Sequence, residues 1–428
     1  MRTTTEPRPT QPSSTAEDFP LQPVPLSARR SLLSLAPILI GFTLYSGTLF
    51  AGGLVGPSFR FFPDLVGVIL LGNLILGLYA AALGYIAGET GLTTVLMARV
   101  SFGRVGSRWV DFILGFTQVG WYAWGSALMA QLLNSLAGVP DTWNWLIILF
   151  FTYFFCSTAY LGYRAMDWLS RVAVSAMVVL MLWSLAIATG DVGGFAGLQA
   201  TALADPLPLG AAITIIVGTF VSGGTQSTNW SRFAPTGQLG FWATLLAFFL
   251  GNGFLIFSGA YCAQVYGEPD IVKVMAQQGL VLWGLVLFFL NMWTTQDNTI
   301  YAFSIAGANM FRTSRRTLFV LGGATVALGL AWGGIYEMLV SYLILLGTFI
   351  PPIGGVIVAD YWLYRREQFP LLETPQPAFN WAGIVAYGLA SVVAYATGEI
   401  GWGIVPINGV VVAIAAYALL SKAIAPQT

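Results

Sequence analysis

The sequence has no histidine, only two cysteines and few charged residues, and each shortage excludes a class of protein. The absence of histidine excludes histidine proton relays and histidine metal sites. Only 8% of the 428 residues are charged and 57% are hydrophobic, whereas soluble domains carry about 25% charged residues. A soluble chain of this length could not bury so much apolar surface. The composition therefore predicts an all-α polytopic membrane protein that lies in a lipid bilayer.

Three further features limit the possible partners and processing. The net charge is zero, so nothing indicates a nucleic-acid partner. Cys156 and Cys262 both lie in apolar segments, where packing is expected and a disulfide framework is not. Residues 1–30 are rich in Pro, Thr and Ser and have no apolar core, so they do not form a signal peptide. We expect them to be a disordered cytoplasmic tail.

Long apolar runs predict twelve membrane-spanning helices of about twenty residues each. Their approximate centres are Tyr45, Leu76, Tyr122, Phe151, Met177, Phe220, Leu250, Thr294, Ala327, Ile350, Gly388 and Val412. With both termini in the cytoplasm, sixteen of the eighteen basic residues fall on the cytoplasmic side, and only Arg60 and Lys273 do not. This bias follows the positive-inside rule and supports both the count and the orientation.

Two spans contain sequences that do not suit a continuous membrane helix. Residues 217–230 of span six hold three glycines among hydroxyl and amide side chains, and residues 41–47 of span one are similar. Glycine costs about 1 kcal/mol relative to alanine in a helix, and freed backbone groups in lipid must line a protein cavity. We therefore predict that helices 1 and 6 are broken, which is typical of the binding site of a secondary transporter.

A repeated tripeptide indicates that the chain contains a duplication. Leu71-Gly72-Asn73 in span two recurs as Leu250-Gly251-Asn252 in span seven, 179 residues later, and the two predicted breaks are 177 residues apart. Five spans per copy is an odd number, so the copies would have opposite orientations in the membrane. The predicted units are a first five-helix repeat at 31–190, an inverted repeat at 206–364 and two accessory helices at 376–422.

Spans three and six offer groups suited to a flat heterocycle. Gln118 and Trp121 lie three residues apart on one helix face, so an amide and an indole could bond and stack on one ring. Phe220 and Ser222 lie at the predicted break in span six, and Phe220 could cover the other face of the ring. Stacking on an aromatic side chain is worth about 1–3 kcal/mol. The alternative is packing for Trp121, an interhelical hydrogen bond for Gln118 and a bond from Ser222 to its own helix.

Span eight contains the most polar stretch inside the membrane, residues 290–299. The hydroxyls of Thr294 and Thr295, with carbonyls freed by the break in span one, could form a sodium site. The alternative is that these hydroxyls bond to their own helix. Asp297 is the only acidic residue placed near the middle of a span, and such residues are functional by default. Its position turns it partly away from the threonines, so we favour an orienting or gating role.

At these residues the sequence resembles nucleobase–cation symporter family 1, and in particular its cytosine permeases. The similarity runs from Pro23 to Asn408. Its strongest blocks are Gly84-Tyr85-Ile86, Thr90-Gly91-Leu92-Thr93-Thr94, Thr117-Gln118-Val119-Gly120-Trp121, Trp293-Thr294-Thr295 with Asp297-Asn298, and Pro351-Pro352-Ile353-Gly354-Gly355-Val356-Ile357-Val358-Ala359-Asp360-Tyr361. The resemblance implies a LeuT-like five-plus-five inverted repeat and sodium-coupled nucleobase import.

The resemblance also implies roles for individual residues. Trp121 and Phe220 would sandwich the base, and Gln118 and Ser222 would bond its edge. Sodium would bind main-chain carbonyls and two hydroxyls, contributed by Gly41, Leu44, Asn291, Thr294 and Thr295. Three positions expected at the pocket depart from the cytosine permease pattern, namely Tyr45 in place of Phe, Thr219 in place of Ser and Gln296 in place of Asn.

These observations predict an importer for cytosine or a closely related nucleobase, multi-pass in the cell membrane or the inner membrane, without a cofactor and with sodium as the coupling ion. Because a hydrogen-bonding site discriminates by donor and acceptor pattern, the three departures leave another planar amide open, such as a purine, uracil, allantoin or a hydantoin. Proton coupling through Asp297 also stays open. A membrane-embedded enzyme is disfavoured, since it would need clustered ionisable residues. The sequence does not predict the oligomeric state.

Overall fold

The computed structural model describes residues 19, 22–161, 163–201, 203, 207–311, 313, 315–370 and 374–424, and every regular element among them is helical. The first half contains η1 (Leu26–Ala28), α1 (Leu32–Thr43), α2 (Ser46–Val55), η2 (Gly56–Ser58), η3 (Phe61–Leu65), α3 (Val66–Thr90), α4 (Thr94–Ser101), α5 (Ser107–Ala137), η4 (Asp141–Trp143), α6 (Asn144–Leu161), α7 (Tyr163–Asp191) and α8 (Gly194–Ala200).

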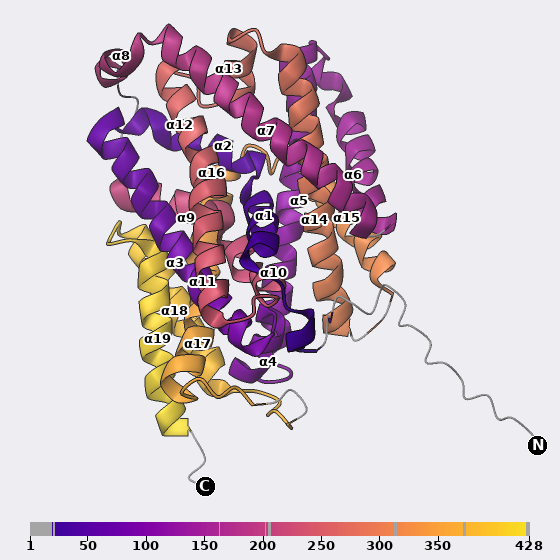
Figure 1. The fold of residues 1–428 in the computed structure, drawn as a ribbon, viewed down its shortest axis with the longest axis vertical. Coiled ribbons are helices and arrows are strands. Elements are labelled where there is room, and N and C mark those ends of the chain that lie inside the picture. Colours follow the sequence, from indigo (N-terminus) through magenta and orange to yellow (C-terminus); the bar gives the residue numbers. More distant parts are fainter. Residues whose placement is uncertain are drawn as a thin grey trace, which may run out of the picture.

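The second half contains α9 (Leu209–Gln226), α10 (Thr228–Ser231), α11 (Gly237–Ala247), η5 (Phe248–Asn252), α12 (Gly253–Tyr266), α13 (Ile271–Gln277), α14 (Val281–Phe311), α15 (Arg316–Trp332), α16 (Leu339–Phe349), α17 (Pro351–Val358), η6 (Ala359–Tyr364), α18 (Trp381–Glu399) and α19 (Val405–Ile424). The long helices form one bundle, with α4 at one end and α8 and α13 at the other (Figure 1). We call these the α4 end and the α13 end.

The helix lengths fit a chain that crosses a membrane many times. Among the described residues, eight helices are long and apolar enough to span, and the bent pair Leu32–Thr43 and Ser46–Ser58 makes a ninth. The other three predicted spans coincide with α5, α14 and α15. Of these, α5 and α14 are 31 residues long and carry polar residues of the predicted site, and α15 has 17 residues. The exact count of twelve stays a prediction.

Span one is broken where the sequence predicts. α1 ends at Thr43, α2 begins at Ser46, and the two axes differ by 58°. Between them Tyr45 is extended, with φ −112° and ψ 130°. Pro37 lies inside α1 without ending it. The break therefore frees main-chain groups at Leu44 and Tyr45 in the interior of the bundle.

The predicted break in span six is wrong at its position. α9 continues through Gly218, Ser222 and Gly224 to Gln226, and only a turn at Ser227 separates it from α10. The glycines serve close packing instead, since a methyl group at Gly218 would lie 2.2 Å from the main-chain oxygen of Leu343. The hydroxyls of Thr225 and Ser227 donate to carbonyls of the same segment. A helix this deeply buried needs small residues to let its neighbours approach.

The repeated asparagines meet inside the bundle. The Asn252 amide nitrogen donates to Asn73 Oδ1 at 2.9 Å, joining α3 to the end of η5. Asn252 Oδ1 accepts from the hydroxyls of Thr48 on α2 at 3.1 Å and Thr219 on α9 at 3.4 Å. The Asn73 amide nitrogen donates to Ile69 O within α3. One buried polar cluster thus connects four helices, two from each predicted repeat.

Residues 24–30, which were predicted to belong to the disordered tail, are instead docked on the α4 end. The guanidinium of Arg29 donates to the carbonyl oxygens of Val24, of Gly88 at the end of α3 and of Ala234 before α11. Burial lowers the pKa of Arg29, and the carboxylate of Glu89 opposes that shift. These bonds account for an ordered segment before α1, whereas most of residues 1–21 lies outside the described part of the chain.

Candidate functional site

The break in span one is held by a side chain from α14. The Asn291 amide nitrogen donates to Leu44 O at 3.1 Å. Its Oδ1 accepts from the Ser46 main-chain N–H at 3.1 Å and also from the Ser46 hydroxyl. Asn291 is completely buried. The freed backbone groups on both sides of Tyr45 are therefore satisfied by one carboxamide, as a break in a membrane interior requires.

The predicted cation ligands on α14 lie beside this contact. The hydroxyls of Thr294 and Thr295 donate to Asn291 O at 2.9 and 2.8 Å, so the alternative of bonding to their own helix is realised. Each hydroxyl oxygen keeps lone pairs for another partner. The two threonines therefore remain able to bind a cation while they keep these bonds.

The predicted carbonyl ligands of span one lie at the end of α1. Gly41 O accepts from the Leu44 N–H at 3.3 Å, and the same turn brings the Tyr45 N–H to Thr43 O at 3.1 Å. The described residues contain no group of three His, Cys, Asp or Glu side chains that could hold a metal. Neutral carbonyl and hydroxyl oxygens of the kind found here suit an alkali cation.

Aromatic rings surround the break on the side of α5. The Tyr45 ring meets Trp121 edge-on, with centroids 5.2 Å apart and an interplanar angle of 89°. Tyr342 from α16 packs on Trp121 at 5.2 Å, and its hydroxyl donates to Thr117 O. The Tyr45 hydroxyl is buried without a hydrogen-bond partner among the described residues. A ligand beside Trp121 would therefore meet an unpaired phenol.

The structure places the two predicted stacking residues in the interior but among different rings. Phe220 contacts Phe42 edge-on at 5.0 Å and Phe248 at 5.7 Å, whereas Trp121 is covered by Tyr45 and Tyr342. The sandwich of a base between Trp121 and Phe220 stays a prediction. It requires a ligand that enters between these two groups of rings.

The predicted edge-binding side chains lie on the helices that carry these rings. Gln118 is buried on α5, one turn before Trp121, and Ser222 is buried on α9 two residues after Phe220. The main-chain oxygen of Ser222 accepts from the Gln226 amide at 3.2 Å. Both side chains are thus close in sequence to an aromatic residue on a helix of the site, and their binding roles stay predictions.

Two of the positions that depart from the family pattern, Thr219 and Gln296, form hydrogen bonds to helix backbone or to another helix. The Thr219 hydroxyl donates to Ile216 O at 2.6 Å and reaches Asn252. The Gln296 amide nitrogen donates to Tyr122 O on α5 at 2.5 Å, and Gln296 Oε1 is buried without a partner among the described residues. In this arrangement Gln296 joins α14 to α5, so a role in ligand binding would act through its free oxygen.

The Asp297 side chain contacts α6. Its Oδ2 accepts from the Thr158 hydroxyl at 3.1 Å, and Thr158 Oγ1 also accepts from the Trp293 indole N–H at 3.1 Å. Asp297 Oδ1 is buried without a hydrogen-bond partner among the described residues. The expected orienting or gating role of Asp297 stays a prediction.

Sequence reasoning missed Tyr342 and the side chain of Asn291. Tyr342 lies in an apolar run of α16 that carries no polar pattern, so no sequence signal marks it. Its contact is tight, because a methyl group at Gly120 would lie 2.4 Å from the Tyr342 hydroxyl. Asn291 was expected to contribute only its main-chain oxygen. A polar residue at the start of the polar stretch of span eight was the available signal for its side chain.

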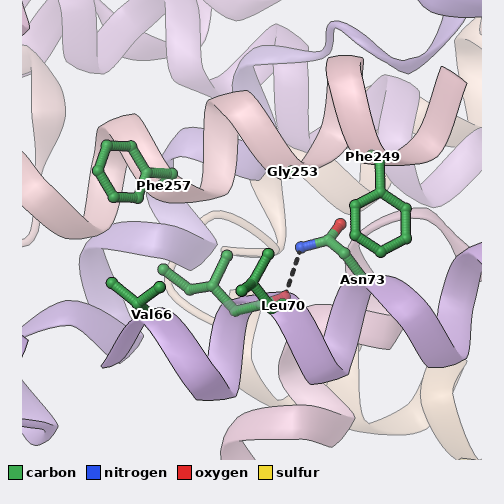
Figure 2. Close-up of a pocket in the computed structure, with 7 residues that line it drawn as sticks. Val66, Leu70, Asn73, Phe249, Gly253 and Phe257 are labelled. Carbon is green, nitrogen blue, oxygen red and sulfur yellow. Dashed lines mark hydrogen bonds between the residues drawn. The ribbon is translucent and has the colours of Figure 1, made fainter. Parts of the chain in front are cut away.

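Two cavities lie elsewhere in the bundle. One of about 210 Å³ lies between α3 and the η5–α12 segment, and Figure 2 shows Val66, Leu70 and Phe257 around it with Asn73 beside Phe249. Its lining is almost entirely apolar, and half-exposed Leu70 places it at the surface of the bundle. Another, of about 320 Å³, lies at the α4 end beside Glu89 and Glu367. Neither is lined by the predicted ligand residues.

Comparison with known proteins identifies relatives along nearly the whole chain. The family model described as permease for cytosine/purines, uracil, thiamine and allantoin matches residues 23–419. The cytosine permease of Escherichia coli strain K12 is 36% identical over 411 residues, which is 96% of each chain.

The solved structures give the same result for the fold. Mhp1 in an inward-facing conformation superposes with a TM-score of 0.79 at 19% identity, covering 94% of this chain and 93% of that one. Mhp1, a nucleobase-cation-symport-1 family transporter, in a closed conformation with bromovinylhydantoin bound, superposes with a TM-score of 0.75 at 20% identity, covering 94% of this chain and 95% of that one. These likenesses confirm the predicted all-helical, LeuT-like fold.

Proposed function

Because this chain belongs to the family of permeases for cytosine, purines, uracil, thiamine and allantoin, a family of transporters and not of enzymes, we propose that it imports cytosine or a closely related nucleobase. The observation that carries this proposal is the assembly at the break in span one. There the Leu44 carbonyl, the Asn291 carboxamide and the Tyr45 ring lie together, with Trp121 against Tyr45.

We propose sodium as the coupling ion. The supporting feature is a set of neutral oxygen atoms, formed by the carbonyls of Gly41, Leu44 and Asn291 and the hydroxyls of Thr294 and Thr295. The Asn291 side chain already bonds Leu44 O at the end of α1, so a cation bound by this set would favour the arrangement in which α1 and α14 stay together. One charge moved through 100 mV supplies about 2.3 kcal/mol, which corresponds to accumulation of about 50-fold, since 1.36 kcal/mol is tenfold.

The transport cycle would follow alternating access. A base would enter beside Trp121, Gln118 and Ser222 would bond its edge, and Phe220 would cover its other face. Movement of the helices that carry Tyr45 and Phe220 against α5 and α14 would then open the opposite side. The excess of basic residues near the α4 end supports a cytoplasmic location for that end and for both termini.

The second candidate is a symporter for another planar amide ligand, such as a purine, uracil, allantoin or a hydantoin. In this candidate the coupling ion could be a proton carried by Asp297 instead of sodium. The observation that favours it is the buried hydroxyl of Tyr45, which has no hydrogen-bond partner in the part of the chain that the structure describes. A ligand with a matching donor or acceptor would satisfy that hydroxyl, and one without it would leave the hydroxyl unpaired.

Uptake into proteoliposomes tests both candidates. We expect radiolabelled cytosine to accumulate with an inward sodium gradient and not with choline, and unlabelled cytosine to compete better than uracil, hypoxanthine, allantoin or hydantoin. Stronger competition by one of the others would change the substrate. Accumulation that depends on a proton gradient in the absence of sodium would contradict sodium coupling.

A further inference from the structure

The Asn291 side chain makes a bridge that resembles pairing between parallel strands. In a parallel ladder, the main chain of one residue donates to the carbonyl before its partner and accepts from the N–H after it. The Asn291 carboxamide does the same around Tyr45, since it donates to Leu44 O at 3.1 Å and accepts from the Ser46 N–H at 3.1 Å. Tyr45 has the extended conformation that such pairing needs.

The main chain of the same residue serves the predicted cation ligands. Asn291 O accepts from the hydroxyls of Thr294 and Thr295. One buried residue therefore contacts the hydroxyl pair with its backbone and the break with its side chain. A shift of Asn291 in response to a cation at these oxygens would move both sets of contacts together.

The position of Tyr45 depends on this bridge. Its main chain is fixed on both sides by Asn291, and its ring lies edge-on to Trp121 with centroids 5.2 Å apart. The ring has little room to move, because a methyl group at Gly47 would lie 2.6 Å from Tyr45 Cε1 and 3.2 Å from Trp121 Cζ3. A change of backbone at Leu44–Ser46 would therefore displace the ring that faces the substrate side.

We propose that the Asn291 carboxamide is a positioning group that fixes the break in span one and thereby links occupancy of the cation ligands to the placement of Tyr45 beside the substrate. This inference rests on the proposed function and extends it, because the side chain is assigned a coupling role separate from ligation by the main chain. Ligand coupling between two sites of a protein is commonly about 5- to 150-fold in affinity.

The test compares Asn291→Ser with Asn298→Ala in the full-length protein in nanodiscs. Asn298 is a matched control on the same helix, because its amide donates within α14, to Thr294 O at 2.7 Å. The first measurement is hydrogen exchange of the segment containing residues 44–48, without sodium and without substrate. We expect exchange to rise at least tenfold in Asn291→Ser and to stay within twofold of wild type in Asn298→Ala. Unchanged exchange in Asn291→Ser would overturn the proposal.

The second measurement is the dissociation constant of radiolabelled cytosine in sodium and in choline. We expect sodium to tighten binding to the wild type and to Asn298→Ala at least fivefold, and to tighten binding to Asn291→Ser less than twofold. An Asn291→Ser protein that keeps the wild-type ratio would overturn the coupling role.

The two proposals fail in different ways. If the cytosine affinity of the wild type does not depend on sodium, both the proposed sodium coupling and the coupling role of Asn291 are overturned. The hydrogen-exchange result would still decide whether Asn291 fixes the break. If Asn291→Ser does not fold, Ser46→Ala serves as the second variant, since it removes only the hydroxyl bond to Asn291 Oδ1. We then expect a smaller rise in exchange, of about twofold to fivefold, and no rise would overturn the proposal.

Discussion

At the scale of single residues, Tyr45 carries a hydroxyl that no group among the described residues satisfies. Tyr45 is only 4% exposed, and its buried hydroxyl has no hydrogen-bond partner among the described residues. An unsatisfied buried polar group costs about 1–3 kcal/mol. Such a cost is acceptable at a binding site if a ligand supplies the missing bond.

We therefore expect Tyr45→Phe to raise the thermal stability of the ligand-free protein and to change substrate preference. The affinity for a base that bonds the hydroxyl should fall about tenfold, because about 1.4 kcal/mol is a factor of ten. Thermal unfolding and competition binding with cytosine, uracil and hydantoin check this. A variant with wild-type preference and lower stability would show that the hydroxyl has a structural role instead.

The cation and substrate roles of the site residues stay predictions, but the positions of these residues differ in how far local sequence signals could indicate them. Threonines and a broken helix are local signals, and the structure places Thr294 and Thr295 beside Asn291 O. The partners of Trp121 are not local, because Tyr342 comes from a helix more than 200 residues later in the chain. Ring packing of that kind depends on the tertiary arrangement of α5 and α16, and no sequence pattern in α16 predicts it.

At the scale of helices, composition predicted one break correctly and misplaced the other. Both segments contain glycines and hydroxyl side chains, but α9 remains helical while α1 and α2 separate. The two segments differ in what contacts their backbone. Asn291 satisfies the freed groups at Leu44 and Ser46, whereas the glycines of α9 allow close contact with other helices. Sequence alone does not distinguish a glycine that breaks a helix from one that packs it.

This distinction predicts the effect of Gly218→Ala. A methyl group there would lie 2.2 Å from Leu343 O, a main-chain atom that cannot rotate away. Overpacking of this kind costs about 1–3 kcal/mol, so we expect lower thermal stability and lower uptake. Gly329→Ala in α15 is the matched control, because nothing lies within 4 Å of its added methyl group. Equal stability of the two variants would mean that Gly218 has no packing role.

The asparagine pair gives a second prediction at this scale. Asn73→Leu and Asn252→Leu should each lower thermal stability. The double variant should lose less stability than the two single variants together, because either single substitution already removes the 2.9 Å bond between the two side chains. Hydrogen bonds between membrane helices contribute about 0.6 kcal/mol on average and up to about 1.7. A double-mutant cycle by thermal or denaturant unfolding measures the coupling. Strict additivity would show that the pair contributes nothing as a pair.

At the scale of the whole molecule, the predicted fold class is confirmed, and the N-terminal boundary is corrected. Hydropathy and charge were sufficient for a multi-pass helical protein, because those properties are set by the bilayer. They could not predict that Arg29 would bind the carbonyls of Gly88 and Ala234, which lie far apart in the chain. This contact joins the ends of spans from both predicted repeats at the α4 end.

We expect Arg29→Met to destabilise the protein, since bonds to a charged donor contribute about 1.5–3 kcal/mol each. Thermal stability should fall, and uptake should fall with it because the N-terminal segment would no longer be bonded to Gly88 at the end of α3 and to Ala234 before α11. Arg108→Met, at an exposed position of α5, is the matched control. Stability equal to that control would indicate that the N-terminal segment docks without contributing to the fold.

The bond between Asn73 and Asn252 also bears on how such a chain arose. A carboxamide both donates and accepts, so it can pair with a copy of itself, which a carboxylate or an ammonium group cannot do. If the two repeats descend from one gene, their common ancestor had a single asparagine at this position. Two ancestral subunits in opposite orientations would have brought that residue opposite itself at a two-fold axis, where a self-complementary contact is required. Gene fusion would then have preserved inside one polypeptide a contact that first held a homodimer together.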